Sequence, residues 1–182
     1  MNGLKTLSKV KNTKLAKQGK ISYEWARSHM QILDNTLNRL KKSKPLKGVT
    51  IGFCLHITKE TSVLVMGAKE LGANVAVCGG NPLTTQDHIA AFLATQGINV
   101  YAWNDQTVKE YDWCIEQVLK HKPSLICDDG ADMNVKVHFD KKFKSLKVLG
   151  STEETTAGVT RVKAMEKQGK LKYPVIIVND AD

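Results

Sequence analysis

The chain has 182 residues and 42% of them are apolar, so it is long enough to bury a core and has an ordinary globular composition. No apolar run approaches the roughly 20 residues of a membrane span, and the lysine-rich start lacks the apolar stretch of a secretory signal. The formal net charge is +9, but the basic residues are nearly all lysines, dispersed over many segments without interleaved aromatic residues. We interpret this charge as a solvated lysine surface and expect neither a nucleic-acid nor a membrane partner.

The beginning of the chain is predicted to be an arm followed by a helix. Residues 1–20 contain six lysines and no acid, which predicts a basic, poorly ordered arm. From Ser22, a plausible helix cap, apolar residues recur at spacings of three and four, as on one face of an amphipathic helix. These apolar residues are Ala26, Met30, Leu33, Leu37 and Leu40. Pro45 then ends the helix.

Beyond Pro45, short apolar runs alternate with helical patterns. Strands are predicted at residues 49–55, 74–78, 100–103, 125–127, 147–150 and 175–178. Helices are predicted at residues 60–71, 86–96, 108–121, 134–144 and 158–168. This alternation predicts an α/β domain over residues 21–182, with a doubly wound, mostly parallel, Rossmann-like sheet that helices cover on both faces.

The cysteines give no sign of a metal site. The four of them form no C-x-x-C pair, and no group of histidines and cysteines has the spacing of zinc ligands. They are Cys54, Cys78, Cys114 and Cys127. Three lie in apolar, strand-like runs, so we interpret them as reduced core thiols of a cytoplasmic protein.

Polar side chains follow three of the predicted strands, where a parallel sheet places its ligand site. In the first group, residues 54–61, His56 has the chemistry of an acid or base near neutral pH. The same group fits a simpler alternative, in which Thr58 caps the following helix, Thr61 lies near the cap and His56 is structural.

The other two groups are rich in carboxylates. Residues 128–132 hold three aspartates, of which adjacent ones repel, so at least one has a raised pKa or a bound partner. Metal binding and a turn rich in Asp and Gly both remain open there. Residues 151–158, with Glu153 and Glu154, fit a capping box or a cluster that binds sugar hydroxyls. The three groups converge on one rim of the sheet and favour a polar small-molecule site.

Five motifs, in order, resemble the S-adenosylhomocysteine hydrolase family. They are His56 with Thr58 and Thr61, Asn81-Pro82-Leu83-Thr84-Thr85-Gln86-Asp87, Asp128-Asp129-Gly130, Glu153-Glu154-Thr155-Thr156 and Val178-Asn179-Asp180. The resemblance covers roughly residue 20 to the end. It implies reversible cleavage of S-adenosyl-L-homocysteine to adenosine and L-homocysteine, with bound NAD oxidising the ribose 3′-hydroxyl first.

The same resemblance assigns roles to site residues. His56 would assist the thiol leaving group and the incoming water, and Asp129 would act at the same carbon. Substrate contacts fall to Thr58, Glu60, Thr61, Asp129 and Glu154, with Glu60 at the adenine amino group and Glu154 at a ribose hydroxyl. Thr155 and Thr156 would reach the nicotinamide end of NAD. Ala157 stands where the family usually has a third threonine, which weakens one contact to NAD.

The resemblance also bears on the end of the chain. After Val-Asn-Asp the family continues through a Thr-Lys pair and an Asp-Asn pair, whose Lys and Asp act on the 3′-hydroxyl. The present sequence ends at Asp182 and has no G-x-G-x-x-G. We therefore expect a substrate-binding domain incomplete at its carboxyl end, without the NAD-binding domain and inactive alone, from an enzyme that is a homo-oligomer when complete. The main alternative is a stand-alone module that binds adenosine or adenosylhomocysteine without catalysis.

Overall fold

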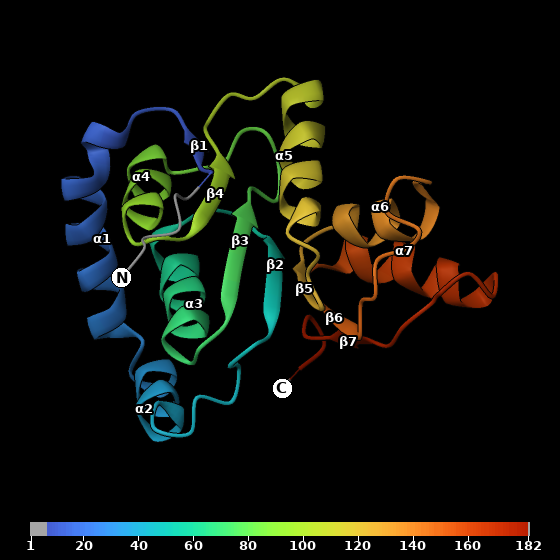
Figure 1. Ribbon diagram of the computed structural model, residues 1–182, viewed down its shortest axis with the longest axis horizontal. Coiled ribbons are helices and arrows are strands. Elements are labelled where there is room, and N and C mark those ends of the chain that lie inside the picture. Colours follow the sequence, from blue (N-terminus) through green and yellow to red (C-terminus); the bar gives the residue numbers. More distant parts are fainter. Residues whose placement is uncertain (1–6, 182) are drawn as a thin grey trace.

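The computed structural model describes residues 7–181, which form a seven-stranded sheet with helices on both sides (Figure 1). All strand pairs are parallel, and their order is β1-β4-β3-β2-β5-β6-β7. The strands are β1 (Lys9–Val10), β2 (Thr50–Cys54), β3 (Asn74–Cys78), β4 (Asn99–Ala102), β5 (Leu125–Asp128), β6 (Gly150–Glu153) and β7 (Val175–Ile177). The helices are η1 (Thr13–Leu15), α1 (Ala16–His29), α2 (Gln31–Leu40), α3 (Lys59–Glu70), α4 (Asp87–Thr95), α5 (Val108–Lys120), α6 (Asp132–Phe139) and α7 (Thr156–Lys167). Within residues 7–181, none of the helices has the length and apolarity that a membrane crossing requires.

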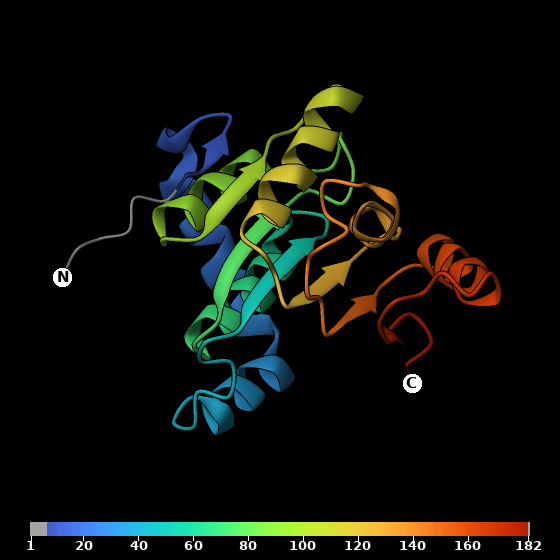
Figure 2. The same cartoon turned by 45° about the vertical axis from the view of Figure 1, so that its right-hand side comes forward.

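Helices α1, α3 and α4 lie on one side of the sheet, and α5, α6 and α7 lie on the other (Figures 1 and 2). Side chains of successive strand residues point to opposite faces, so a doubly covered strand must be apolar throughout. In β2, Phe53 joins the core under α3 and α4, whereas its neighbour Cys54 joins the core under α5. This arrangement confirms the predicted doubly wound, Rossmann-like α/β fold.

The chain reverses its direction across the sheet between β2 and β5. From β2 it winds through α3 and α4 to β3 and β4, and α5 then returns it to β5 on the other side of β2. The two strands pair in register from Ile51 with Leu125 to Cys54 with Asp128. Ligands of such sheets bind in the crevice at the carboxyl ends of the strands on either side of this reversal.

The prediction of a poorly ordered arm over residues 1–20 is wrong from Leu7 onward, and residues 1–6 lie outside the described part of the chain. Residues 9 and 10 form β1, an edge strand that pairs with β4, and α1 already begins at Ala16. The lysine-rich composition suggested a solvated arm, but Lys9 makes specific cation–π contacts that fix this segment to the sheet. Its ammonium lies 4.6 Å from the ring centre of Trp103 and 4.9 Å from that of Trp113.

The predicted helix after Ser22 is two helices, α1 and α2, that meet at Met30 (φ −110°, ψ 56°). Ser22 lies inside α1 and is not its cap. The break between the two helices is bridged by Arg27 of α1. Its guanidinium donates to Asp34 of α2 at 2.8 Å and to Glu70 of α3 at 2.6 Å. These partly buried, charge-assisted bonds tie α1 to both α2 and α3.

The region around residues 140–153 also differs from the prediction. Helix α6 ends at Phe139 rather than near Lys144, because Asp140 is extended and its carboxylate accepts the Lys142 amide at 2.9 Å. The strand predicted at 147–150 is displaced to Gly150–Glu153. Its Ser151 and Glu153 side chains are polar but buried and hydrogen-bonded, so a search for apolar runs misses the strand.

Candidate functional site

A histidine and an aspartate meet at the point where the sheet reverses. His56 follows β2 and Asp129 follows β5, and His56 Nε2 lies 3.1 Å from Asp129 Oδ2. On the other side of the ring, His56 Nδ1 lies 2.6 Å from Thr84 Oγ1. In the neutral ring that donates Nε2–H to the carboxylate, Nδ1 accepts from the threonine hydroxyl. The ring is therefore oriented from both sides.

The loop that carries His56 is fixed by the start of α3 and by a glycine. Thr58 caps α3, with its hydroxyl accepting the Thr61 amide at 3.3 Å, so the predicted capping role is confirmed. A side chain on Gly80 would place its Cβ 3.1 Å from the backbone nitrogen of His56 and 3.4 Å from Asp129 Oδ2. The absence of a side chain at Gly80 thus lets the loop lie close to both residues of the pair without crowding them.

The turn after Asp129 has an unusual backbone. Gly130 (φ +88°) and Ala131 (φ +61°) are both in the left-handed region, which costs a residue with a side chain about 1 kcal/mol. The Gly130 amide donates to Glu153 Oε1 at 2.9 Å, which ties the turn to the end of β6. Such a conformation persists only when its surroundings hold it.

Asp128, one residue before the pair, is completely buried. Burial raises its pKa to about 7, and nearby Glu153 adds to the effect. Its carboxylate accepts the Asn134 amide at 2.7 Å and the Asp129 amide at 3.1 Å. One of these acids thus has a raised pKa, but burial causes the shift rather than the expected repulsion between adjacent carboxylates. Within residues 7–181 no group of acids, histidines and cysteines is arranged for a metal ion.

The raised pKa of Asp128 predicts how stability depends on pH. The folded chain holds a proton on Asp128 up to about pH 7, whereas the unfolded chain loses it near pH 4. Between these values the folded state binds more protons, so the free energy of unfolding falls as pH rises. We expect Asp128→Asn to make this fall shallower, by up to ~1 kcal/mol per pH unit. Urea unfolding from pH 4.5 to 8 measures it, and parallel curves for the two proteins would contradict it.

The third group contributes both structure and exposed polar atoms. Glu153 is fully buried, and its Oε1 accepts from the Thr155 amide at 3.2 Å and the Thr155 hydroxyl at 3.1 Å. The Thr155 hydroxyl also accepts the Gly158 amide as the cap of α7, but the expected capping box is absent there, because a glycine stands where the box needs a carboxylate or amide side chain. Burial, with Asp129 and Glu153 nearby, raises the pKa of Glu154. Glu154 directly follows β6, and its amide donates to the Asp128 carbonyl oxygen at 3.1 Å, so it lies on the same rim as the His56–Asp129 pair.

The remaining predicted residues lie along the same rim without contacting the pair. Glu60 is exposed in the first turn of α3, 3.7 Å from the Lys59 ammonium. Thr156 is exposed at the first position of α7. The sequence analysis noted Thr84 only within a motif and assigned no role to it or to Gly80, although the Gly-Gly pair directly after β3 indicated a close backbone approach.

These features define a class of protein: a doubly wound α/β domain whose polar residues meet at the strand reversal, where such domains bind small molecules. Comparison with known proteins makes the class specific. The model of the family S-adenosyl-L-homocysteine hydrolase matches residues 8–149 and 138–182, and the chain belongs to this family.

Curated relatives agree with this assignment. The chain is 51% identical to the adenosylhomocysteinase of Sulfurisphaera tokodaii over 173 residues, which are 95% of this chain and 41% of the relative. It is 45% identical to the S-inosyl-L-homocysteine hydrolase of Methanopyrus kandleri over 172 residues, which are 94% of this chain and 41% of the relative. The chain thus spans about two fifths of the length of the relatives it matches.

Proposed function

We propose that this chain binds the nucleoside part of S-adenosyl-L-homocysteine and supplies His56 and Asp129 to its reversible cleavage into adenosine and L-homocysteine. The observation that carries the proposal is the 3.1 Å contact between His56 and Asp129 at the strand reversal. In this role the chain acts as part of a longer enzyme, because it spans about two fifths of its relatives. A module that binds the nucleoside without catalysis remains the alternative function of the chain by itself.

The pair has the chemistry that departure of a thiol requires. A protonated His56 can hand its proton to the departing sulfur, and the neutral ring can then accept a proton from water. Asp129 and Thr84, which contact opposite nitrogens of the ring, hold it in one orientation for both transfers. Glu154 follows the neighbouring strand β6 on the same rim and offers carboxylate oxygens to a ribose hydroxyl.

NAD is the cofactor that the family resemblance implies, and it would supply the oxidation of the ribose 3′-hydroxyl. Thr156 suits the proposed contact, because it is exposed at the amino end of α7, where peptide N–H groups and the helix dipole favour a ligand's polar atoms. Thr155 suits it less well, because its hydroxyl already bonds Glu153 and the Gly158 amide.

The family relatives act on either adenosyl or inosyl substrates, and Glu60 favours the adenosyl one. A carboxylate only accepts hydrogen bonds, so it suits the adenine amino group and repels the carbonyl oxygen of hypoxanthine. We expect the wild-type chain to bind adenosine more tightly than inosine. Glu60→Gln, which adds a donor, should weaken adenosine binding about tenfold, a change of ~1.4 kcal/mol, and reduce the discrimination against inosine.

Isothermal titration of the purified chain with each nucleoside tests this proposal. Glu166→Gln is the matched control, because Glu166 is exposed on α7 and its substitution removes the same charge from a different helix. Tighter binding of inosine by the wild type would contradict the choice of substrate. Absence of binding at millimolar concentrations of both nucleosides would contradict the proposed nucleoside site itself.

A further inference from the structure

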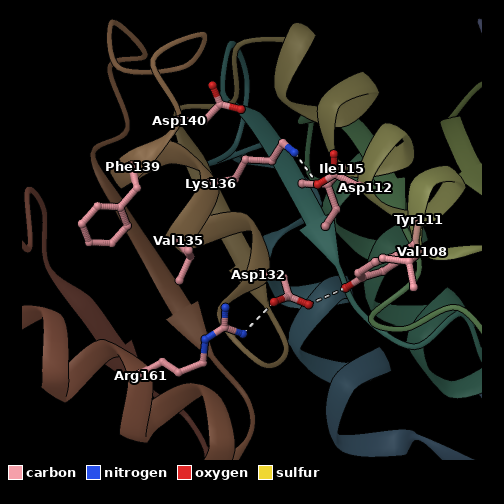
Figure 3. Close-up of a pocket in the computed structure, with 10 residues that line it drawn as sticks. All are labelled: Val108, Tyr111, Asp112, Ile115, Asp132, Val135, Lys136, Phe139, Asp140 and Arg161. Atoms are coloured by element: carbon pink, nitrogen blue, oxygen red, sulfur yellow. Dashed lines mark hydrogen bonds and ion pairs between the residues drawn. The ribbon is translucent and has the colours of Figure 1, made fainter.

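A second polar cluster lies behind the His56–Asp129 pair, on the side of the sheet covered by α5, α6 and α7. Tyr111 of α5, Asp132 of α6 and Arg161 of α7 are hydrogen-bonded in a row (Figure 3). The Asp132 carboxylate accepts from the Tyr111 hydroxyl at 2.9 Å and from the Arg161 guanidinium at 2.6 Å. All three line a cavity of about 500 Å³, whose lining does not include His56 or Asp129. We call these three residues the brace.

One end of the brace holds the loop after β3. The Tyr111 hydroxyl lies 3.0 Å from the Gly80 carbonyl oxygen, so its single proton is shared between this oxygen and Asp132. Burial raises the pKa of Tyr111, so the hydroxyl remains a donor. Gly80 in turn packs against the backbone of His56 and the carboxylate of Asp129. A shift of Gly80 would therefore change the space available to the pair.

The other end of the brace holds the turn after Asp129. The Arg161 guanidinium donates to the Gly130 carbonyl oxygen as well as to Asp132. The Gly130 amide is bonded to Glu153, so this left-handed turn is held from both of its polar sides. Removal of one side leaves a strained turn with less to oppose its relaxation.

We propose that Tyr111, Asp132 and Arg161 are positioning residues, which hold the Gly80 loop and the Asp129 turn so that His56 and Asp129 keep their contact. None of the three touches the pair directly, so their effect passes through Gly80 and Gly130. This inference rests on the proposed function only where it concerns nucleoside binding. The geometry of the turn is testable without any ligand.

Hydrogen exchange of the Gly130 amide in the 182-residue chain tests the Arg161 end. Arg161→Met removes the guanidinium and keeps an aliphatic side chain, and Lys163→Met removes one charge from the same helix. We expect Gly130 exchange to be at least tenfold faster in R161M than in K163M. A difference below twofold would overturn the proposal at this end.

The Tyr111 end is tested by Tyr111→Phe, which keeps the buried ring. Tyr101→Phe is the control, because its hydroxyl bonds His121 at the opposite end of α5 (2.9 Å). We expect the two variants to lose similar amounts of melting temperature relative to the wild type. Only Y111F should also shift the amide resonances of Gly80 and His56. Equal shifts in both variants would mean that Tyr111 is merely structural, and the proposal would fail.

Adenosine titration links the brace to function. We expect Y111F and R161M each to raise the dissociation constant about tenfold, with Y101F and K163M within twofold of wild type. Unchanged affinity in R161M despite faster Gly130 exchange would refute the link between the brace and the site. If the wild type binds no adenosine, the proposed function fails, whereas the exchange and resonance measurements still decide whether the brace holds the turn.

Discussion

The purified 182-residue chain, supplied with NAD and S-adenosyl-L-homocysteine, is expected to release no homocysteine above an enzyme-free blank. The reason is chemical, because the chain contains no G-x-G-x-x-G to hold the dinucleotide. In the proposed reaction, oxidation at the ribose activates the bond to sulfur, so an acid–base pair alone would not cleave it. Homocysteine release by the isolated chain would show that residues 1–182 hold all the machinery required.

Joining the chain to the part of the Sulfurisphaera tokodaii relative that follows the matched region should give an active enzyme. In that protein, His56→Asn should lower kcat by about 10² to 10⁴, the usual contribution of one acid–base group. Asparagine keeps an amide near the position of Nδ1, and so a bond to Thr84, but removes the Nε2 that faces Asp129. The measurement is the initial rate of homocysteine release.

The matched control for this substitution is His121→Asn, at the end of α5, where the ring bonds Tyr101. It removes the same group from a place distant from the strand reversal, and kcat should stay within about twofold of the unsubstituted protein. If H56N and H121N had equal rates, His56 would have no acid–base role, and the contact with Asp129 would be structural.

The fold could be predicted because its signals are local. The apolar runs that become β2 and β3 are visible in the sequence. The start of α5 is also set locally, by a capping box that Thr107 forms with Glu110. The convergence of His56 and Asp129 could also be predicted, because the order of a doubly wound sheet places the ends of β2 and β5 side by side.

The failures occurred where a polar residue has a specific tertiary partner. Lys9 was predicted to lie in a charged arm because Trp103 and Trp113, which its ammonium contacts, are distant in the sequence. The sequence of β6 resembles a polar loop, because its buried Ser151 is satisfied by a hydrogen bond to Asn134 of α6 at 2.9 Å. Such a contact between separate elements is not visible in the sequence. The brace was missed for the same reason, since periodicity gives no information on which buried hydroxyl meets which carboxylate.

The largest stability effect is expected from Gly158→Ala in the first turn of α7. At an ordinary helix position this change stabilises a protein by about 0.5–1 kcal/mol, because alanine restricts the unfolded chain. Here the added Cβ would lie 2.0 Å from Glu153 Oε1 and 2.2 Å from its carboxyl carbon. We expect the reverse sign, a loss of about 3 kcal/mol or more, since the buried carboxylate must leave its hydrogen bonds.

A double-mutant cycle separates the clash with Glu153 from any other destabilising effect of alanine at position 158. In a Glu153→Ala background the oxygen that meets the new Cβ is absent, so G158A should cost much less, with a coupling of at least ~2 kcal/mol by urea unfolding. Equal costs in the two backgrounds would contradict the clash. Because Glu153 also holds the Gly130 amide at 2.9 Å, the same cycle reports on the turn that carries Asp129. A glycine on α7 thereby serves the geometry of the His56–Asp129 pair through one buried carboxylate.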